Sequence, residues 1–352
     1  MKRALDTAIC KLFGVRYPIV QTGMGWVSGA RLTAATSAAG GLGILASATM
    51  TFAELEKAIR DVRERTDAPF GVNLRTDQTD IGERVALLVR EKVKVASFAQ
   101  APRKDIVQRL KDGGVLTMPT VGAKRHAEKV AEMGVDAIIA QGHEGGGHTG
   151  PVPTSLLLPQ VTSAVDIPVL GAGGFFDGRG LVAALAWGAA GIAMGTRFLL
   201  TRESTVPDAI KKTYLETQVT GTVVTKAIDG YPQRVIRTKL VEALEASTAV
   251  GALARAARHA WQFRGLTGTS MTALVREGLA MKKSNELTYG QMAMAANAPM
   301  LTRASMVEGR PEVGILPTGQ VVGVIEELPT VAELLGRIVQ EAESTLGRLG
   351  AS

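Results

Sequence analysis

The sequence predicts an α/β fold: a (β/α)8 TIM barrel with an additional, mainly helical domain near the C-terminus. Between residues 15 and 200, apolar β-type runs alternate with stretches whose apolar residues recur at helical spacing. Eight such runs occur, and eight evenly spaced βα units favour a closed parallel barrel over an open sheet. The first turn also lacks the G-x-G-x-x-G pattern of a dinucleotide-binding sheet.

The predicted strands are apolar runs of four to six residues: 18–21, 43–46, 70–74, 93–98, 115–119, 137–141, 168–171 and 191–194. The predicted helices between them are 31–39, 52–65, 81–90, 104–112, 123–133, 153–164 and 178–187. Both sets follow from hydrophobic periodicity. Regular alternation of this kind continues up to residue 200 and then stops.

After Arg202 the pattern changes to helical stretches with few convincing strands. These stretches are 207–216, 238–244, 252–263, 271–281 and 289–297. A last helix, 331–346, follows a Leu-Pro-Thr turn and is predicted to return to the barrel wall. We therefore expect a barrel over 1–205, a helical domain over the barrel mouth at 206–300, and a C-terminal segment with its helix at 301–352.

Composition narrows the class of protein. The chain has 352 residues, of which 46% are hydrophobic, and it contains 40 glycines. A single cysteine, Cys10, excludes an internal disulfide and favours a reducing cytoplasm. No run of 18 apolar residues occurs, which argues against a membrane-spanning segment. The oligomeric state stays open, and a homodimer is compatible with the sequence.

The net charge of +7 is unevenly placed, since residues 208–283 carry twelve Lys or Arg and six Asp or Glu. One interpretation is an ordinary solvated helical surface. The other is a guide for an anionic substrate, such as a phosphate-bearing thioester carrier. No helix-turn-helix, zinc-finger or RNP pattern accompanies the charge, so a nucleic-acid partner is not expected.

Two glycine-containing turns follow the last two predicted strands. Ala172, Gly173 and Gly174 come after the seventh strand, and Gly195 and Thr196 after the eighth. In α/β barrels these two loops commonly hold a phosphate, with backbone N–H groups as donors. The alternative is that the glycines only permit sharp turns. The pairing of the two positions favours a phosphate site.

Other strand ends carry residues suited to a flat ring system. Thr22, Gly23 and Met24 follow the first strand, where small residues let backbone lie against a ring edge. Asn73 ends the third strand and Gln141 the sixth, and each amide could hydrogen-bond a ring carbonyl or nitrogen. A turn-forming role is the alternative for Asn73.

Residues 141–150 form a glycine-rich loop with two histidines at the end of the sixth strand. Gly146 and Gly147 would let the backbone approach a ligand, and an imidazole there can move a proton near neutral pH. His143 and His148 do not have the H-E-x-x-H spacing, and glycines break any helix between them, so no metal is expected.

These features together resemble the nitronate monooxygenase/2-nitropropane dioxygenase-like family of FMN-dependent barrels, which includes flavin-dependent enoyl-thioester reductases. The similar segments are 17–25, 39–43, 70–73, 144–150, 171–174, 194–198 and 319–323. The resemblance implies that His148 is the catalytic acid/base beside the flavin. It also implies that the turns 172–174 and 195–196 hold the FMN phosphate, and that 22–24, Asn73 and Gln141 face the isoalloxazine.

Within the family, the sequence is similar to a group of actinobacterial flavin-dependent dehydrogenases/reductases of steroid C/D-ring breakdown. The segments 24–27, 45–50, 174–180, 198–201 and 294–297 carry this similarity. It implies an acyl-CoA substrate derived from a methyl-hydrindanone carboxylic acid, oxidised or reduced at its α,β carbon–carbon bond, with NAD(H) as redox partner. One alternative is a nitronate monooxygenase that uses O2, and another is a flavin-binding protein without catalysis.

Overall fold

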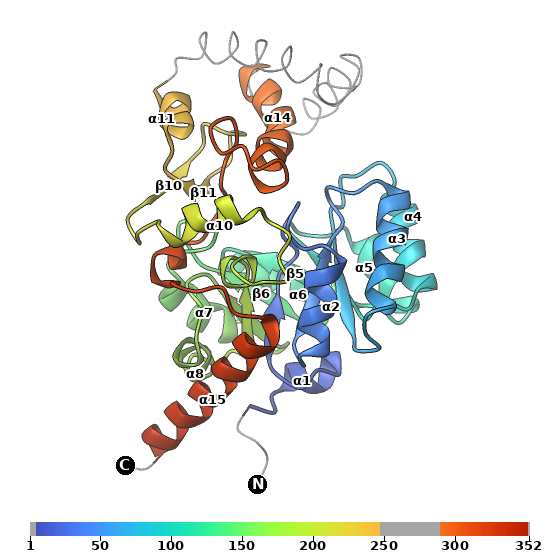
Figure 1. Cartoon of the computed structure of the whole chain (residues 1–352). Coiled ribbons are helices and arrows are strands. Elements are labelled where there is room, and N and C mark those ends of the chain that lie inside the picture. The colour runs from blue at the N-terminus through green and yellow to red at the C-terminus, as the bar shows by residue number, and fades with distance from the viewer. Residues whose placement is uncertain (1–4, 247–288, 351–352) are drawn as a thin grey trace.

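Eight parallel strands close into a barrel in the order β1-β2-β3-β4-β5-β6-β8-β9 (Figure 1). The computed structural model describes residues 5–246 and 289–350, with the side chains of 289–297 excepted. Pairing of β1 with β9, in which Ile19 faces Ile192, completes the ring. The barrel strands are β1 (Ile19–Gln21), β2 (Leu42–Ala46), β3 (Phe70–Leu74), β4 (Val95–Phe98), β5 (Leu116–Val121), β6 (Ile138–Gln141), β8 (Val169–Ala172) and β9 (Gly191–Met194).

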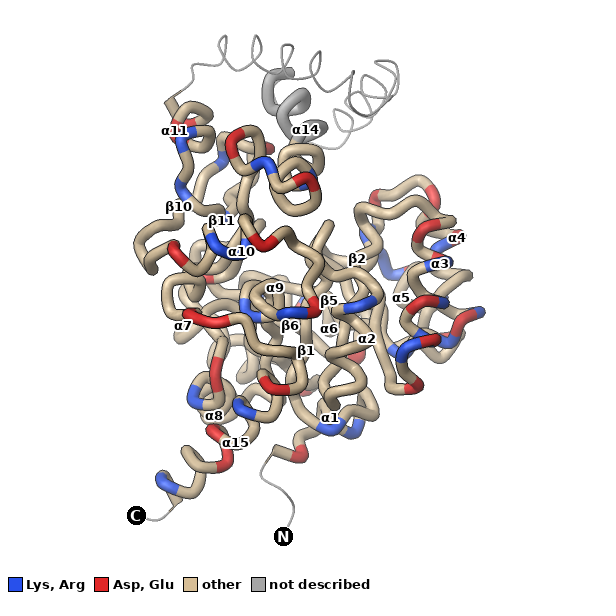
Figure 2. The backbone as a smooth tube through the Cα atoms, viewed as in Figure 1, with Lys and Arg blue, Asp and Glu red and all other residues tan. Residues whose placement is uncertain are grey.

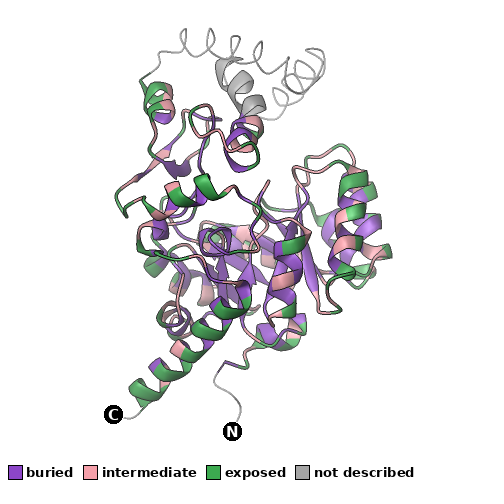
Figure 3. Cartoon of the chain, viewed as in Figure 1, coloured by how far each residue is buried: buried purple, intermediate pink, exposed green. Residues whose placement is uncertain are grey.

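Amphipathic helices form the outer layer, with their buried faces toward the strands (Figure 3). They are α2 (Ala30–Ala38), α3 (Phe52–Arg63), α4 (Ile81–Arg90), α5 (Lys104–Asp112), α6 (Lys124–Glu132), α7 (Thr154–Thr162) and α8 (Gly178–Ala186). In α3, a capping box between Thr51 and Glu54 fixes the start, and Leu55, Ile59 and Val62 are buried at helical spacing. The barrel fold is thus confirmed, with predicted bounds of these strands and helices within two residues of the observed ones.

The barrel interior is an apolar core closed at one end by α1 (Ala8–Phe13), which the sequence analysis did not predict. Ile9 and Phe13 are fully buried and cluster with strand residues such as Val20 and Met118. The lone cysteine, Cys10, is also buried in α1, and burial raises the pKa of its thiol. The strands terminate at the opposite end of the barrel.

A second group of elements lies at that opposite end, away from α1 and both termini (Figure 1). It contains α9 (Thr196–Leu199), α10 (Asp208–Leu215), β10 (Thr222–Thr225), β11 (Gln233–Ile236), α11 (Lys239–Glu245) and α14 (Tyr289–Met306). The strands β10 and β11 form an antiparallel sheet with β7 (Gly147–His148), in the order β10-β11-β7. These three strands were not predicted from the sequence, because β7 has only two residues and β10 and β11 lie in a stretch whose pattern indicated mainly helices.

The chain then returns to the barrel. After the short 3-10 helix η1 (Gln320–Val324), the helix α15 (Val331–Gly350) packs against α8 and α2. Glu341 of α15 accepts a hydrogen bond from the Gly178 N–H at the start of α8, at 2.8 Å. Leu335 and Ile338 of α15 are buried in the same contact region.

The predicted helices 252–263 and 271–281 and the motif side chains at 294–297 lie outside the described residues. α14, predicted to end at residue 297, continues through Pro299 to Met306. No helix among the residues the structure describes is long and apolar enough to cross a membrane.

Candidate active site

The predicted site residues gather at the ends of the barrel strands, because parallel strands all terminate at the same rim. The loops that follow β1 and β9 touch each other. The Thr22 N–H donates to the Met194 carbonyl at 3.1 Å. A side-chain carbon added at Gly195 would lie 3.2 Å from Thr22 Oγ1 and 3.3 Å from Met24 Sδ. Thr22, Met24 and Gly195 therefore form one continuous surface.

Gly23 and Asn73 are also in contact. A Cβ at Gly23 would lie 2.5 Å from the Cβ of Asn73, so only glycine fits beside this asparagine. The Asn73 amide donates to Ser97 Oγ at 3.1 Å, which fixes its orientation. Asn73 is 9% exposed and lies one residue before the end of β3. A held amide of this kind at the rim can offer its oxygen to a ligand.

The glycine turn after β8 has the backbone shape of an anion cradle. Ala172 pairs with Gln141 across β8 and β6, and Gly173 and Gly174 follow with φ of +97° and +82°. Such angles favour glycine. In the described part of the chain, the N–H groups of Gly174, Phe175, Gly195 and Thr196 donate to no protein acceptor. Four unpaired donors from two adjacent loops fit an anionic phosphate group.

His148 lies on β7, a two-residue strand inside the glycine loop. Gly147 precedes it with φ of +64°, and the pair aligns antiparallel with Arg234 and Gln233 of β11. The Gln141 side-chain amide donates to the His148 carbonyl at 2.7 Å. Through this bond Gln141 holds the histidine backbone, and the ring contact predicted for its amide from the sequence stays a prediction.

The His148 ring forms a pair with Asp229, which the sequence analysis missed. Nε2 of His148 lies 2.7 Å from Oδ2 of Asp229, with side-chain exposures of 63% and 9%. Asp229 Oδ1 accepts the Tyr231 N–H at 3.1 Å. Burial opposes ionisation of Asp229, but hydrogen bonds and charge from His148 and the Tyr231 N–H outweigh it and lower its pKa. The carboxylate is therefore ionised near neutral pH.

A local signal for Asp229 does exist. Asp229-Gly230 lies between the β-branched run 222–225 and the segment 233–236, and Asp-Gly is a dipeptide typical of turns. That pattern indicates a turn at this place. It gives no indication that the turn meets His148, because 81 residues separate the two side chains.

The glycine loop is supported by a segment from near the C-terminus. The Gln320 N–H donates to the Glu144 carbonyl, and the Gly319 N–H donates to Thr196 Oγ1, both at 2.9 Å. A Cβ at Gly146 would lie 2.5 Å from the Gly319 nitrogen, so Gly146 is required for this close packing. The contacts join the histidine loop to the loop after β9.

His143, the other histidine of the glycine-rich loop, has a structural role. His143 Nδ1 lies 2.8 Å from the Gly150 carbonyl oxygen, which can only accept, so this nitrogen donates. The His143 backbone carbonyl accepts a hydrogen bond from the buried guanidinium of Arg234 at 3.1 Å. Among the described residues, no group of three or more His, Cys, Asp or Glu side chains is arranged to hold a metal ion.

Figure 2 shows where the basic residues lie along the chain, and those of the predicted cluster at 208–283 differ in burial. Lys211 and Arg234 are buried, and burial lowers the pKa of each. The exposed ones are Lys212, Lys226, Arg237 and Lys239. Lys212 lies 3.8 Å from Glu216 Oε1, and none of the other three forms an ion pair within the described ranges. The remaining basic residues of the predicted cluster, beyond residue 246, lie outside the described residues.

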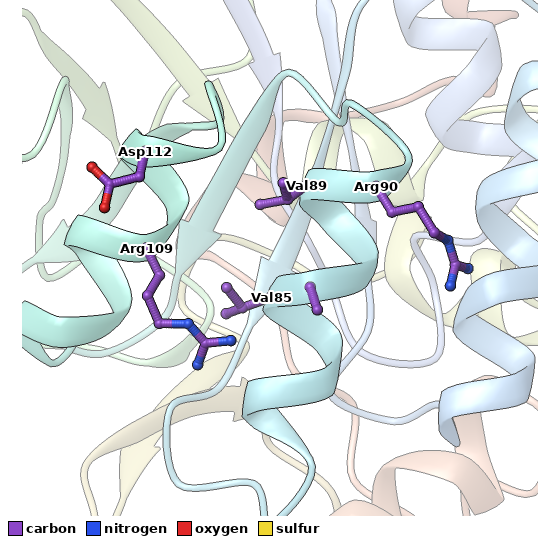
Figure 4. A pocket seen from close by; sticks show the side chains of 6 residues that line it. Val85, Val89, Arg90, Arg109 and Asp112 are labelled. Atoms are coloured by element: carbon purple, nitrogen blue, oxygen red, sulfur yellow. The ribbon is translucent and has the colours of Figure 1, made fainter.

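A separate groove lies on the outer helical layer, between α4 and α5 (Figure 4). Val85 and Val89 line it together with Arg109 and Asp112. None of the predicted site residues borders this groove.

The family model for nitronate monooxygenase matches residues 6–84 and 80–341. A (3aS,4S,5R,7aS)-5-hydroxy-7a-methyl-1-oxo-octahydro-1H-indene-4-carboxyl-CoA dehydrogenase from Rhodococcus jostii (strain RHA1) is 56% identical over 347 residues. The match covers 99% of this chain and 98% of that protein. The enzyme of the same name from Mycobacterium tuberculosis (strain ATCC 25618 / H37Rv) is 55% identical, with 96% of each chain covered.

Among solved structures, FabK from Thermotoga maritima is similar throughout, with a TM-score of 0.78 and 33% identity. The alignment covers 99% of each chain. The likeness therefore includes the elements that follow the barrel.

Proposed function

The chain belongs to the nitronate monooxygenase family, and we propose that it is an FMN-dependent, NAD(H)-linked dehydrogenase of a CoA thioester. The proposed substrate class is the CoA ester of a steroid-derived methyl-hydrindanone carboxylic acid. The proposed location of the enzyme is the cytoplasm. Support comes from two relatives that are at least 55% identical over nearly the full length and whose names specify such a thioester. The coarser assignment, an oxidoreductase of a flavin-dependent family, does not depend on the substrate.

The observation that carries the proposal is the position of His148. It lies on β7, and the unpaired N–H groups belong to the loops after β8 and β9 at the same barrel rim. Binding of a flavin phosphate by Gly174 and Gly195 would therefore leave the ring system within the region that His148 borders. We propose that the ring is contacted by Thr22, Gly23, Met24, Asn73 and Gln141. The cofactor site would be completed by Gly146, Gly147, Ala172, Gly173 and Thr196.

The proposed chemistry divides the two hydrogens of the α,β bond between protein and cofactor. A thioester carbonyl acidifies its α-carbon, so the α-proton can leave as H⁺ to the His148 ring. When bound, the flavin would supply the two-electron chemistry, exchanging with NAD(H) the hydride removed from the β-carbon. The substrate thus loses H⁺ and H⁻, and the single bond becomes a double bond. In reverse, protonated His148 returns the proton to the α-carbon.

We also propose that residues 206–300 form a substrate cap over a barrel of residues 1–205, with 301–352 returning to the barrel. Support comes from β7–β11 pairing and from the Trp26 indole N–H, which donates to the Pro299 carbonyl of α14 at 3.0 Å. Exposed Lys226, Arg237 and Lys239 would meet the phosphates of CoA, for which cationic side chains are suited.

An anaerobic titration tests this function. The purified protein is loaded with FMN and titrated with NADH, and the reduced protein is then mixed with candidate unsaturated CoA esters. We expect NADH to bleach the visible absorbance of the flavin and the ester to restore it. A colourless protein that does not retain added FMN would contradict the proposal, as would a flavin that neither NADH nor any saturated or unsaturated CoA ester changes.

The family model favours a second candidate, oxidation of alkyl nitronates by O2. Oxygen uptake measured with a small nitronate, beside NADH-dependent turnover of a CoA ester, separates the two. Rapid uptake with the nitronate and no turnover of the ester would favour the monooxygenase.

A further inference from the structure

We infer that Asp229 is the positioning residue for His148 and holds its ring in the tautomer with the proton on Nε2, leaving Nδ1 as the base. This inference rests on the proposed function only for its catalytic consequence. The tautomer itself is a property of the protein without cofactor or substrate.

The hydrogen-bond chemistry of the pair determines the tautomer. An ionised carboxylate can only accept, so the 2.7 Å contact with Asp229 Oδ2 requires a proton on His148 Nε2. A neutral imidazole carries one proton, and Nδ1 then has the free lone pair. The His148 side chain is 63% exposed, and in the described part of the chain its Nδ1 has no hydrogen-bond partner.

The carboxylate is held from both sides. Oδ1 accepts the N–H of Tyr231 at 3.1 Å, in the turn geometry that aspartate often adopts. The Asp229 side chain is 9% exposed, and the Tyr231 ring stands edge-on to the His148 ring at 6.1 Å between centroids. With both oxygens engaged, rotation of the carboxylate would break two hydrogen bonds.

The backbone fixes the two partners relative to each other. The Thr149 N–H donates to the Pro232 carbonyl at 3.0 Å, and Gln233 pairs with His148 across β11 and β7. Gly230, with φ of +88°, donates to the Lys226 carbonyl at 2.9 Å and closes the turn. The base and its orienting acid thus come from distant parts of the chain and meet in one small sheet.

The expected consequence for catalysis is twofold. The ring is presented to the substrate in one orientation, and the imidazolium that forms on proton uptake lies next to a carboxylate that stabilises it. A role in turn structure alone would require only the Oδ1 contact with Tyr231. One substitution can therefore distinguish a role of Asp229 in fixing the His148 tautomer from a role in turn structure alone.

Asp229→Asn is that substitution. If the Asn oxygen keeps the Tyr231 N–H, its NH2 group faces His148 Nε2 and forces that nitrogen to accept. We expect long-range ¹H–¹⁵N spectra of histidine-labelled protein at pH 8 to show Nε2–H in the wild type and Nδ1–H in the variant. A His148→Gln spectrum assigns the signal, and Asp105→Asn on α5 is the matched control that leaves it unchanged.

Two spectral results would overturn the inference: Nδ1–H in the wild type, or the same tautomer in the wild type and in Asp229→Asn. Kinetics give an independent measure of positioning. With a CoA ester that the wild type turns over, kcat should fall about 100-fold or more while KM stays within about threefold. Unchanged kcat would remove Asp229 from catalysis. If no CoA ester is turned over at all, the proposed function fails, and the spectra still decide the tautomer.

Discussion

Glu144 caps helix α7 from within the histidine loop. One of its carboxylate oxygens, Oε2, accepts the Thr154 backbone N–H at 2.9 Å and the Thr154 hydroxyl at 2.7 Å. Pro153, at the N-cap position, provides no side-chain acceptor, so Glu144 supplies one from ten residues earlier in the chain. The loop that carries His148 and the helix that follows it are therefore stabilised together.

Glu144→Ala should lower the free energy of unfolding by about 1–2 kcal/mol, because it leaves donors at the α7 N-terminus without a partner. Glu144→Gln should cost less, since its amide oxygen can still accept the Thr154 N–H. Urea titration measures both changes. Glu343→Ala, at an exposed position on α15, is the control and should stay within about 0.5 kcal/mol. Equal losses for Glu144→Ala and Glu343→Ala would contradict the capping role.

His148→Ala should retain bound FMN and lose turnover of a CoA ester by about 10²- to 10⁴-fold, because positioned proton transfer supplies rate enhancement of that size. Flavin absorbance measures the first quantity and steady-state kinetics the second. His126→Ala, on the exposed face of α6, is the control and should behave as the wild type. Full activity of His148→Ala would remove this histidine from the mechanism.

Gly174→Ala should weaken FMN binding by about tenfold or more, a change of at least about 1.4 kcal/mol, by distorting the turn that presents unpaired N–H groups. Gly114→Ala is a close control. The two glycines have φ of +82° and +74°, and an added Cβ would meet nothing closer than 3.8 Å at either. Both variants should lose about 1–2 kcal/mol of stability from backbone strain. If FMN affinity, measured by fluorescence titration, were the same in both variants, the cradle assignment would be wrong.

Asp229 should make stability depend on acidity in a defined direction. Its pKa in the folded protein is below its ordinary value of 3.8, so its ionised form stabilises the fold above that pH. This contribution should disappear as pH falls from about 4 through the folded-state pKa. The stability advantage of the wild type over Asp229→Asn should therefore decrease as pH falls from about 5 to 3. Urea unfolding across that range measures it, and a difference independent of pH down to 3 would contradict the lowered pKa.

The hydrophobic periodicity of the sequence was by itself sufficient to predict the barrel. The alternation of β-type runs and helical stretches is local, and each run reports whether its own faces are buried. Phe70–Leu74 and Ile81–Arg90 were predicted with the bounds that the structure shows. The loop with His148 and the glycine turns at 172–174 and 195–196 were also placed at strand ends from sequence, because strand direction in parallel βα units fixes which loops share a rim.

Only the tertiary structure decided what surrounds that rim. Asp229 meets His148 through β7–β11 pairing, and β7 has just two residues, too few to leave a periodic signal. The packing of Gly319 against Gly146 and the hydrogen bond from Gln141 to the His148 backbone likewise leave no signal in the sequence. Such contacts depend on which distant backbone segments hydrogen-bond to one another. A pattern of residues along the chain reports burial and turn formation locally. It was therefore sufficient to locate His148, whereas its partner Asp229 could be identified only from the tertiary structure.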